Sequence, residues 1–158
     1  MNQHEIRKFR HNLRRFERLV VSHFKGFGCC EGVSLAQCHA LMEIDGQGPL
    51  NLGELAGSLG LDKSTLSRTV DGLVNIGLVE RKPHPRDRRS ILLSLTDQGQ
   101  RTCDNINANN DALFLRVFNR IDPQTRGDIA AHFQTLVETM ACETGENCSS
   151  CLLTEGNG

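Results

Sequence analysis

The 158-residue sequence predicts a mainly α-helical protein with a small β wing, and three observations support that fold class. Apolar residues recur at spacings of three and four along most of the chain, which is the period of an amphipathic helix. Capping residues and glycines divide these periodic stretches into separate helices. Only the stretch from 78 to 95 changes to a β-prone pattern, around a proline-rich turn.

The first predicted helix carries a narrow apolar stripe and ends at Gly26 and Gly28. A stripe this narrow is typical of a helix that packs against another helix rather than on a broad core. We therefore expect residues 1–25 to contribute to dimerisation. The stripe consists of Ile6, Phe9, Leu13, Phe16 and Val20.

Capping signals mark the starts of the next two helices. Ser34 followed by Gln37 predicts a capping box, in which each side chain bonds the other's backbone N–H. Asn51 with Glu54 predicts a second box, and Gly60 can end the short helix that follows it. The boundaries of both helices are therefore predicted from local residues alone.

The helices predicted at 51–59 and 62–76 are joined by a tight Gly-Leu-Asp turn and have the dimensions of a helix-turn-helix. Small hydroxylated residues near the start of the second helix allow close approach to a DNA groove, and Arg68 can contact a guanine edge or a phosphate. An ordinary helix pair with a capped, polar start is the alternative interpretation. The candidate DNA-contacting residues here are Lys63, Ser64, Thr65, Ser67 and Arg68.

Two β-prone stretches, LVERK and SILLSL, flank the loop PHPRDRR and predict a hairpin with a cationic tip. Five cations lie within nine residues there, with Glu80 and Asp87 as the nearby acids. Arginine in a narrow minor groove gains from the negative potential of that groove, so the hairpin is predicted to contact DNA. The cations are Arg81, Lys82, Arg86, Arg88 and Arg89.

Two long helices are predicted after the hairpin. The first begins at Thr96 or Asp97, and its apolar stripe over 103–117 includes the polar Asn110, a type of residue that fixes register between paired helices. An Asp-Pro pair at 122–123 starts the last helix. The predicted divisions are a dimerisation helix with its junction (1–33), a winged helix-turn-helix (34–95), C-terminal dimerisation helices (96–141) and a flexible cysteine-containing tail (142–158).

The net charge of −1 conceals two basic blocks. Residues 1–25 contain seven Lys/Arg and two acids, and residues 61–90 contain seven Lys/Arg and four acids. Localised positive charge in an otherwise neutral chain predicts a polyanion-binding surface. For the first block, a solvated helix face is an equally good interpretation.

The segment LDKSTLSRTVDGLVNIGLVERKPHPRDRRSILLSLTDQG resembles the core of the MarR family of transcriptional regulators. The resemblance covers about residues 34–100, and the flanking helices agree with it in number and length. It implies a homodimeric repressor that binds a pseudo-palindromic operator in double-stranded DNA, with the helix 62–76 in the major groove. It also implies that Asp87 orients the wing through arginine contacts and that Arg89 enters the minor groove.

The seven cysteines and the cysteine-bearing tail depart from many members of that family. Cys29 and Cys30 are adjacent, Cys38 follows eight residues later, and a CxxC pair lies in the acidic tail. Three thiolates favour a soft, thiophilic effector such as As(III), whereas Zn(II) needs a fourth ligand, for example His39. No cofactor is predicted to be obligatory. The candidate effector-binding thiols are Cys29, Cys30, Cys38, Cys148 and Cys151.

Two other interpretations of the cysteines stay open. A thiol redox sensor needs only two nearby thiols, one of them with a low pKa, although the acidic neighbours of these cysteines disfavour it. Cys103 is predicted to be a small buried hydrophobic residue, and Cys38 fits that description as well as it fits a ligand.

The sequence predicts a regulator rather than an enzyme. It contains no phosphate-binding loop, Ser-His-Asp arrangement or HExxH motif. A metal-binding protein-interaction module without DNA binding is the alternative from a different class. No apolar run approaches the ~18 residues of a membrane span, and the polar N-terminus lacks a signal-peptide block, so a cytoplasmic protein without membrane partners is expected.

Overall fold

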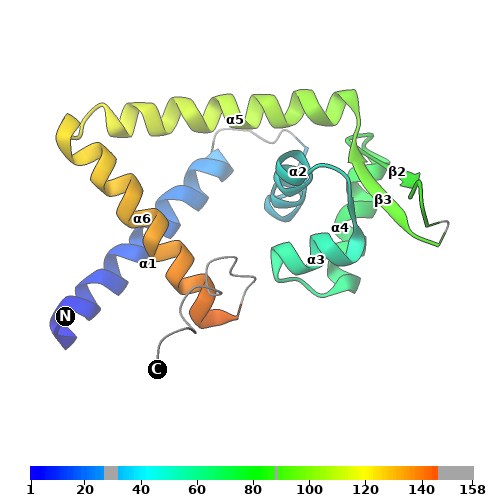
Figure 1. The fold of residues 1–158 in the computed structure, drawn as a ribbon. Coiled ribbons are helices and arrows are strands. Elements are labelled where there is room, and N and C mark those ends of the chain that lie inside the picture. Colours follow the sequence, from blue (N-terminus) through cyan, green and yellow to red (C-terminus); the bar gives the residue numbers. More distant parts are fainter. Residues whose placement is uncertain (27–31, 88, 146–158) are drawn as a thin grey trace.

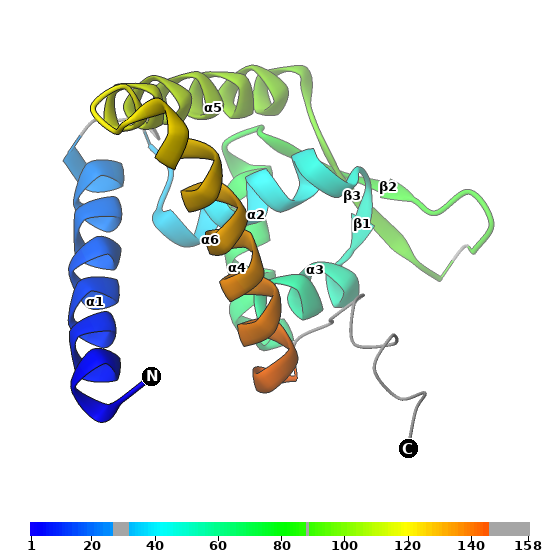
Figure 2. The ribbon, with the colours of Figure 1, turned by 60° about the vertical axis from the view of Figure 1, so that its left-hand side comes forward.

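The computed structural model describes residues 1–26, 32–87 and 89–145. The elements, in chain order, are α1 (Gln3–Gly26), α2 (Leu35–Gln47), β1 (Leu50–Asn51), α3 (Leu52–Leu59), α4 (Lys63–Asn75), β2 (Val79–Pro83), β3 (Ile91–Leu95), α5 (Asp97–Phe118) and α6 (Pro123–Thr144). Figure 1 shows α5 spanning the molecule, with the winged helix at its start and α6 following its end. Figure 2 shows the hairpin of β2 and β3 pointing away from α1 and α6. The predicted winged helix-turn-helix between flanking helices is confirmed.

The helices of the winged helix start where the sequence supplies capping side chains. Ser34 and Gln37 form the predicted capping box at α2. At α3, Asn51 Oδ1 accepts the backbone N–H of Glu54 at 3.0 Å, and the N–H of Asn51 donates to Glu54 Oε2 at 2.8 Å. Gly60 ends α3 in the left-handed region, with φ 61°. These contacts satisfy backbone groups that a helix leaves unpaired at its ends.

The small sheet has three antiparallel strands in the order β1-β3-β2. β2 and β3 pair in register from Val79↔Leu95 onward, as the predicted hairpin requires. The sequence predicted only these two strands, whereas Leu50 of β1 also pairs with Leu93 of β3. β1 has only two residues, and the second of them, Asn51, is also the cap of α3, so the strand is too short for any alternation to show in the sequence.

The core lies within the winged helix, and the first half of α5 adds to it. Cys103 and Ile106 of α5 are both 0% exposed, whereas Val117 further along the same helix is 45% exposed. The stripe over 103–117, predicted to face another helix, is therefore divided between two surroundings. The largest fully buried side chains are those of Leu41, Leu55, Leu66, Leu73, Ile106, Val70, Val79 and Cys103.

α1 and α6, which we call the arms, differ from the winged helix in their burial. No residue of α6 is buried, and none of α1 up to His23 is buried. The rings of Phe16 and Phe133 meet edge to face with centroids 6.1 Å apart, so the two arms touch. Of the apolar stripe predicted on α1, Ile6, Phe9, Leu13 and Phe16 are exposed and Val20 is half-buried. Among the described residues, no helix has the length and apolar content needed to cross a bilayer.

α6 continues beyond the predicted helix end at 141. It includes Cys142 and ends at Thr144, where Gly145 adopts the left-handed conformation that closes the helix. The start of the segment that was predicted to be a flexible tail is therefore helical. A glycine at this position is a common helix stop, and it is the signal that the sequence-based boundary missed.

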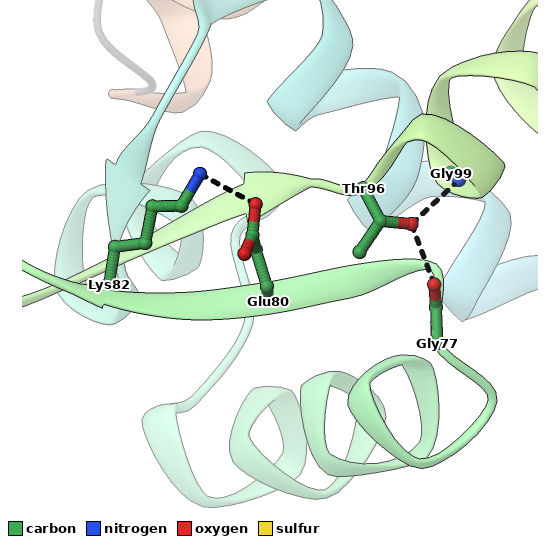
Figure 3. Close-up of polar contacts among 5 residues, drawn as sticks. All are labelled: Gly77, Glu80, Lys82, Thr96 and Gly99. Carbon is green, nitrogen blue, oxygen red and sulfur yellow. Dashed lines mark hydrogen bonds and ion pairs between the residues drawn. The ribbon is translucent and has the colours of Figure 1, made fainter.

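Thr96 ties the sheet to α5 (Figure 3). Its hydroxyl donates to the carbonyl oxygen of Gly77 at 2.6 Å and accepts the N–H of Gly99 at 3.0 Å. The N–H of Thr96 donates to the carbonyl oxygen of Leu78 at 3.1 Å. Only glycine fits at Gly99, because a Cβ there would lie 2.0 Å from that same carbonyl oxygen. The junction therefore fixes the direction in which α5 leaves the winged helix.

Candidate nucleic-acid interface

α4 is amphipathic and presents its predicted DNA-contacting residues to solvent. Leu66, Val70 and Leu73 anchor it in the core with 0% exposure. Residues three and four apart share one face of a helix, so the positions between these anchors lie on another face. On α4, Lys63, Ser64, Thr65 and Arg68 are exposed, and Ser67 is half-buried.

Asp62 caps α4 and engages two of the predicted DNA-contacting residues. Its Oδ1 accepts the Ser64 hydroxyl at 2.6 Å and the Thr65 backbone N–H at 2.9 Å, and its Oδ2 accepts the Thr65 hydroxyl at 2.6 Å. These hydrogen bonds, the one from Ser64 above all, hold the pKa of Asp62 well below its ordinary value. The two hydroxyl protons therefore serve the helix start, a role that the sequence did not predict.

The wing tip comprises residues 84–90, and its described residues, 84–87 with 89 and 90, form a turn closed by their own hydrogen bonds. The N–H of His84 donates to the carbonyl oxygen of Ser90, and the N–H of Ser90 donates to that of Asp87, both at 3.0 Å. Asp87 Oδ1 accepts the backbone N–H of Arg89 at 2.9 Å. In this structure Asp87 orders the wing through a backbone group, where the family resemblance implied arginine contacts. Arg86, Asp87 and Arg89 are exposed, and Arg88 lies outside the described residues.

His84 was not among the residues predicted from the sequence. Its Nδ1 accepts the backbone N–H groups of Arg86 and Asp87, each at 3.1 Å. The residue is half-buried in the turn. The signal in the sequence is its place between two prolines, two residues before a polar turn, where an Asn or Asp side chain commonly bonds the backbone.

A groove of about 560 Å³ lies between the start of α4 and the wing. Cations from three elements line it: Lys63 from α4, Arg81 from β2 and Arg89 from the wing tip. Arg81 pairs with Asp71 of α4 at 2.6 Å, and Lys82 pairs with Glu80 at 2.6 Å (Figure 3). Within the described ranges, neither Lys63 nor Arg89 takes part in an ion pair. Their positive charges therefore suit a phosphate group between them.

Of the five predicted effector-binding thiols, one lies in the described part of the chain. Cys38 is on α2 and 3% exposed. Among the described residues, no group of three His, Cys, Asp or Glu side chains is placed to hold a metal ion. Cys142, at the end of α6, takes part in a disulfide. The other predicted thiols, Cys29, Cys30, Cys148 and Cys151, lie outside the described residues.

Cys103 is buried, as predicted. Its Sγ lies 3.8 Å from the carbonyl oxygen of Leu41. Burial, followed by the negative charges of Asp45 and Asp104, raises the pKa of this thiol to about 11. A thiol that holds its proton so firmly is a poor ligand and a poor nucleophile.

Known proteins resemble this chain in sequence and fold. Residues 33–91 match the family model described as MarR family. The HTH-type transcriptional repressor MdtR of Bacillus subtilis (strain 168) is 30% identical over 128 residues, or 81% of this chain and 79% of that protein. A MarR family protein from Bacillus stearothermophilus has a similar fold, with a TM-score of 0.81, 20% identity, and coverage of 89% of this chain and 99% of that one.

Bordetella bronchiseptica BpsR, whose structure is described as showing regulation of its DNA binding by 6-hydroxynicotinic acid, has a TM-score of 0.67, 22% identity, and coverage of 82% and 98%. Some other relatives align over about half of their own length, 47% for an HTH-type regulator of Mycobacterium leprae. MarR proteins are DNA-binding transcriptional regulators, typically dimeric, and not enzymes. The extent of the match to MdtR, together with the winged helix between long flanking helices, shows that the chain belongs to the MarR family.

Proposed function

We propose that this protein is a homodimeric transcriptional repressor that binds a pseudo-palindromic operator in double-stranded DNA, and that it acts in the cytoplasm. The groove between α4 and the wing carries this proposal, because Lys63 and Arg89 face it without a carboxylate partner among the described residues. When a helix reads the major groove and a wing enters the adjacent minor groove, one sugar–phosphate backbone passes between them. In this docking, that DNA backbone runs along the protein's groove between α4 and the wing.

The DNA-contacting residues of the proposal come from both sides of that backbone. Arg68 extends from the exposed face of α4 toward a base edge or a phosphate, and the wing arginines enter the minor groove. The full set is Lys63, Ser64, Thr65, Ser67 and Arg68 of α4 with Arg86, Asp87, Arg88 and Arg89 of the wing.

The exposed arms support the homodimer. Phe133 and Met140 of α6 are 49% and 57% exposed, and Phe16 of α1 is 45% exposed. Exposed apolar side chains gathered on two helices that touch, as Phe16 and Phe133 do, favour an interaction site. A second copy of the chain both covers it and supplies the second reading helix that a pseudo-palindrome requires, about 34–36 Å from the first.

For the signal that releases DNA, we propose an effector that binds thiolates, with As(III) or Zn(II) as the candidates. The support is the position of Cys29 and Cys30, which lie between α1 and the winged helix along the chain, with Cys38 following in the first helix of the winged helix. A hundredfold release requires about 2.7 kcal/mol of coupling between effector and DNA. Several thiolate bonds are strong enough to supply that, if the DNA-bound dimer holds the sulfurs apart.

The effector proposal is tested by operator release in three proteins. These are the wild type, the Cys29→Ser/Cys30→Ser variant, and a chain that ends at Cys142. Loss of the As(III) or Zn(II) response in either altered protein supports the thiol site. An equal response in all three excludes both the Cys29/Cys30 pair and the Cys148/Cys151 pair of the tail. A response to peroxide alone supports a redox sensor. A response only to an aromatic acid supports the kind of ligand that is described for BpsR.

DNA binding is tested by fluorescence anisotropy with a duplex from the region upstream of the gene, over a range of salt concentrations. We expect Lys63→Gln to reduce the slope of log K against log salt by about 0.9, the value for one phosphate contact. Arg89→Ala should weaken binding by about 1–3 kcal/mol, and Arg68→Ala should reduce either sequence discrimination or overall affinity.

Lys8→Gln is the matched control, because it removes the same charge from α1, away from the groove. It should leave the salt slope unchanged. If the Arg89 and Arg68 variants bind like the wild type, the docking model is wrong. If the wild type shows no salt-dependent binding to DNA, a protein-interaction module becomes the better description.

A further inference from the structure

We infer that His84 is a positioning residue for DNA binding, which holds the wing tip in shape only while its imidazole is neutral. The inference rests on the proposed function, because the shape of the wing affects binding only if the wing contacts DNA. It also gives operator binding a dependence on pH that the DNA-contacting arginines cannot produce, since arginine stays charged throughout the physiological range.

The hydrogen bonds of the ring define its protonation state. Nδ1 of His84 accepts from both the Arg86 and the Asp87 N–H, so Nδ1 carries no proton and the neutral ring holds its hydrogen on Nε2. A protonated imidazole has N–H donors on both nitrogens. It would direct a third donor at the two backbone donors, so both hydrogen bonds would be lost together.

The described residues of the wing tip make few other hydrogen bonds. The pairing of β2 with β3 ends at Pro83↔Ile91, and Pro85 has no N–H to donate. Beyond that point, the described residues of the tip make five hydrogen bonds among themselves, and His84 Nδ1 accepts two of these. Both donors belong to the segment that displays Arg86 and leads to Arg89. Without them, the arginines lose their fixed spacing.

The charges around the ring act in two directions. Among the described residues, the charged groups of the hairpin near the ring are Arg86 and Arg89 on the tip, the Lys82–Glu80 pair on β2, and Asp87, whose carboxylate is bonded to the N–H of Arg89. Arg88 lies outside the described residues. Arg81 on β2 is paired with Asp71 of α4, and β3 carries no charge. The arginines would repel a positively charged ring, whereas DNA phosphates would attract one. The acceptor atom, Nδ1, faces the backbone of the turn, so a proton on it breaks the turn. We expect this loss to outweigh the attraction between a charged ring and DNA phosphates, so acid weakens DNA binding.

The test compares wild type, His84→Asn and His84→Ala by anisotropy at constant salt from about pH 8 to pH 5, where histidine ordinarily changes charge. Asparagine accepts from N–H groups two and three residues ahead without titrating, so it should replace the ring. At pH 8, wild type and His84→Asn should bind alike, and His84→Ala about tenfold more weakly, as expected for one or two net hydrogen bonds. At pH 5, wild type should bind as weakly as His84→Ala, while His84→Asn keeps its advantage.

At each pH, the operator affinity of the wild type is divided by that of His84→Asn. This ratio removes the contribution of the other five histidines, which both proteins share. A constant ratio across the pH range overturns the inference, as does a His84→Ala protein that binds like wild type at pH 8. A wild type that gains on His84→Asn in acid also overturns it, because the ring then acts as a phosphate-binding cation. Equal thermal unfolding of the three proteins shows that the core is unaffected.

A measurement without DNA separates this inference from the proposed function. In the ¹⁵N-labelled full chain, the His84 ring is identified by its absence from the spectrum of His84→Asn. At pH 8 its Nδ1 should have the chemical shift of an unprotonated nitrogen, and the amide signals of Arg86 and Asp87 should move on acidification. A proton on Nδ1 at pH 8 overturns the inference whether or not the protein binds DNA. A correct ring signal with no DNA binding overturns the proposed function instead.

Discussion

The winged helix and the arms treat their apolar side chains in opposite ways. Leu41, Leu55 and Leu66 of the winged helix are all 0% exposed. The arms carry apolar stripes at helical spacing as well, but Phe133 and Met140 remain about half exposed, at 49% and 57%. Most of the stability of a helix in a protein comes from packing of its apolar face. The winged helix is therefore stabilised within one chain, whereas the arms leave their apolar faces exposed in a single chain, and we expect a second chain to cover them.

α5 belongs to both regions. Ile106, in its first half, is fully buried against the winged helix, whereas Leu115 in its second half is 62% exposed. A single helix therefore connects the winged helix to the arms. In the proposed dimer, we expect a change in the packing of the arms to alter the spacing of the reading helices through this helix and the Thr96 junction, which fixes its direction.

The strongest test of this comparison is a charge placed on the arm. Phe133→Glu puts a carboxylate where the second chain should pack, and burying an unpaired charge is strongly unfavourable. We expect a monomer by sedimentation and a loss of operator affinity of about 100-fold or more, because two linked reading helices become one. The cooperative unfolding of the winged helix should persist.

Ala131→Glu is the control for that variant, since it adds the same charge to an exposed position of α6 away from the apolar stripe. It should leave the dimer and DNA binding intact. A Phe133→Glu protein that stays dimeric, or one that loses the winged helix too, would contradict the division into two regions.

A second test compares two glycines, one at the junction and one in an arm. Gly99→Ala forces a Cβ against the carbonyl oxygen of Leu78 and should reduce the free energy of unfolding by about 2–3 kcal/mol. Gly127→Ala in α6 meets nothing within 4 Å in the chain and should be neutral or stabilising by up to about 1 kcal/mol. Urea unfolding of both variants measures the difference. If both variants changed the free energy of unfolding by a similar amount, the backbone at the Thr96 junction would have moved to make room for the added Cβ.

Features that depend on residues close together in the sequence were predicted well. The capping boxes of Ser34 with Gln37 and of Asn51 with Glu54 fix where two helices begin, because both partners lie within three residues of each other. β1 was missed because two residues carry no period, and its strand character comes from pairing with the distant Leu93. The division of α5 was missed for the same reason, since what a stripe faces depends on tertiary packing.

In the candidate site, too, the features that depend on local sequence were predicted, and those that depend on tertiary structure were not. The exposed positions of α4 follow from helical periodicity, and the charge of the wing follows from composition. The role of His84 depends on how the turn folds back on the ring, and the pairing of Arg81 with Asp71 joins residues ten apart on different elements. The prolines on either side of His84 mark a turn, but they do not show that the ring accepts two backbone N–H groups, and the Arg81–Asp71 pair has no local signature in the sequence.

A smaller effect is expected at the start of α4. Asp62→Asn weakens the cap by removing its charge, and should lower the melting temperature by a few degrees at pH 7 and weaken DNA binding modestly. Because the folded-state pKa of Asp62 lies below its unfolded value, the charged cap stabilises the protein above about pH 4. That contribution is lost as the pH falls further, through the folded-state pKa.

The melting temperatures of wild type and Asp62→Asn should therefore converge in acid. Ser64→Ala removes the hydrogen bond that contributes most to the low pKa of Asp62, and should shrink the acid-sensitive part of the difference. If the difference between wild type and Asp62→Asn is the same at pH 7 and in acid, the carboxylate does not act as the charged cap of α4.

The smallest effect is expected at Cys103, which should not react at all while the winged helix is folded. Its side chain is 0% exposed, and a thiol with a pKa of about 11 is only about one-thousandth ionised at pH 8. Alkylation by iodoacetamide, followed by mass spectrometry of the peptide that contains Cys103, should show labelling only through unfolding. Gly99→Ala should therefore speed labelling about 30-fold, the factor that corresponds to 2 kcal/mol of lost stability, while Gly127→Ala should not speed it. Labelling of the wild type at the rate seen in urea would show that the core of the winged helix opens locally. The winged helix would then not be stable within one chain, and its contrast with the arms would be wrong.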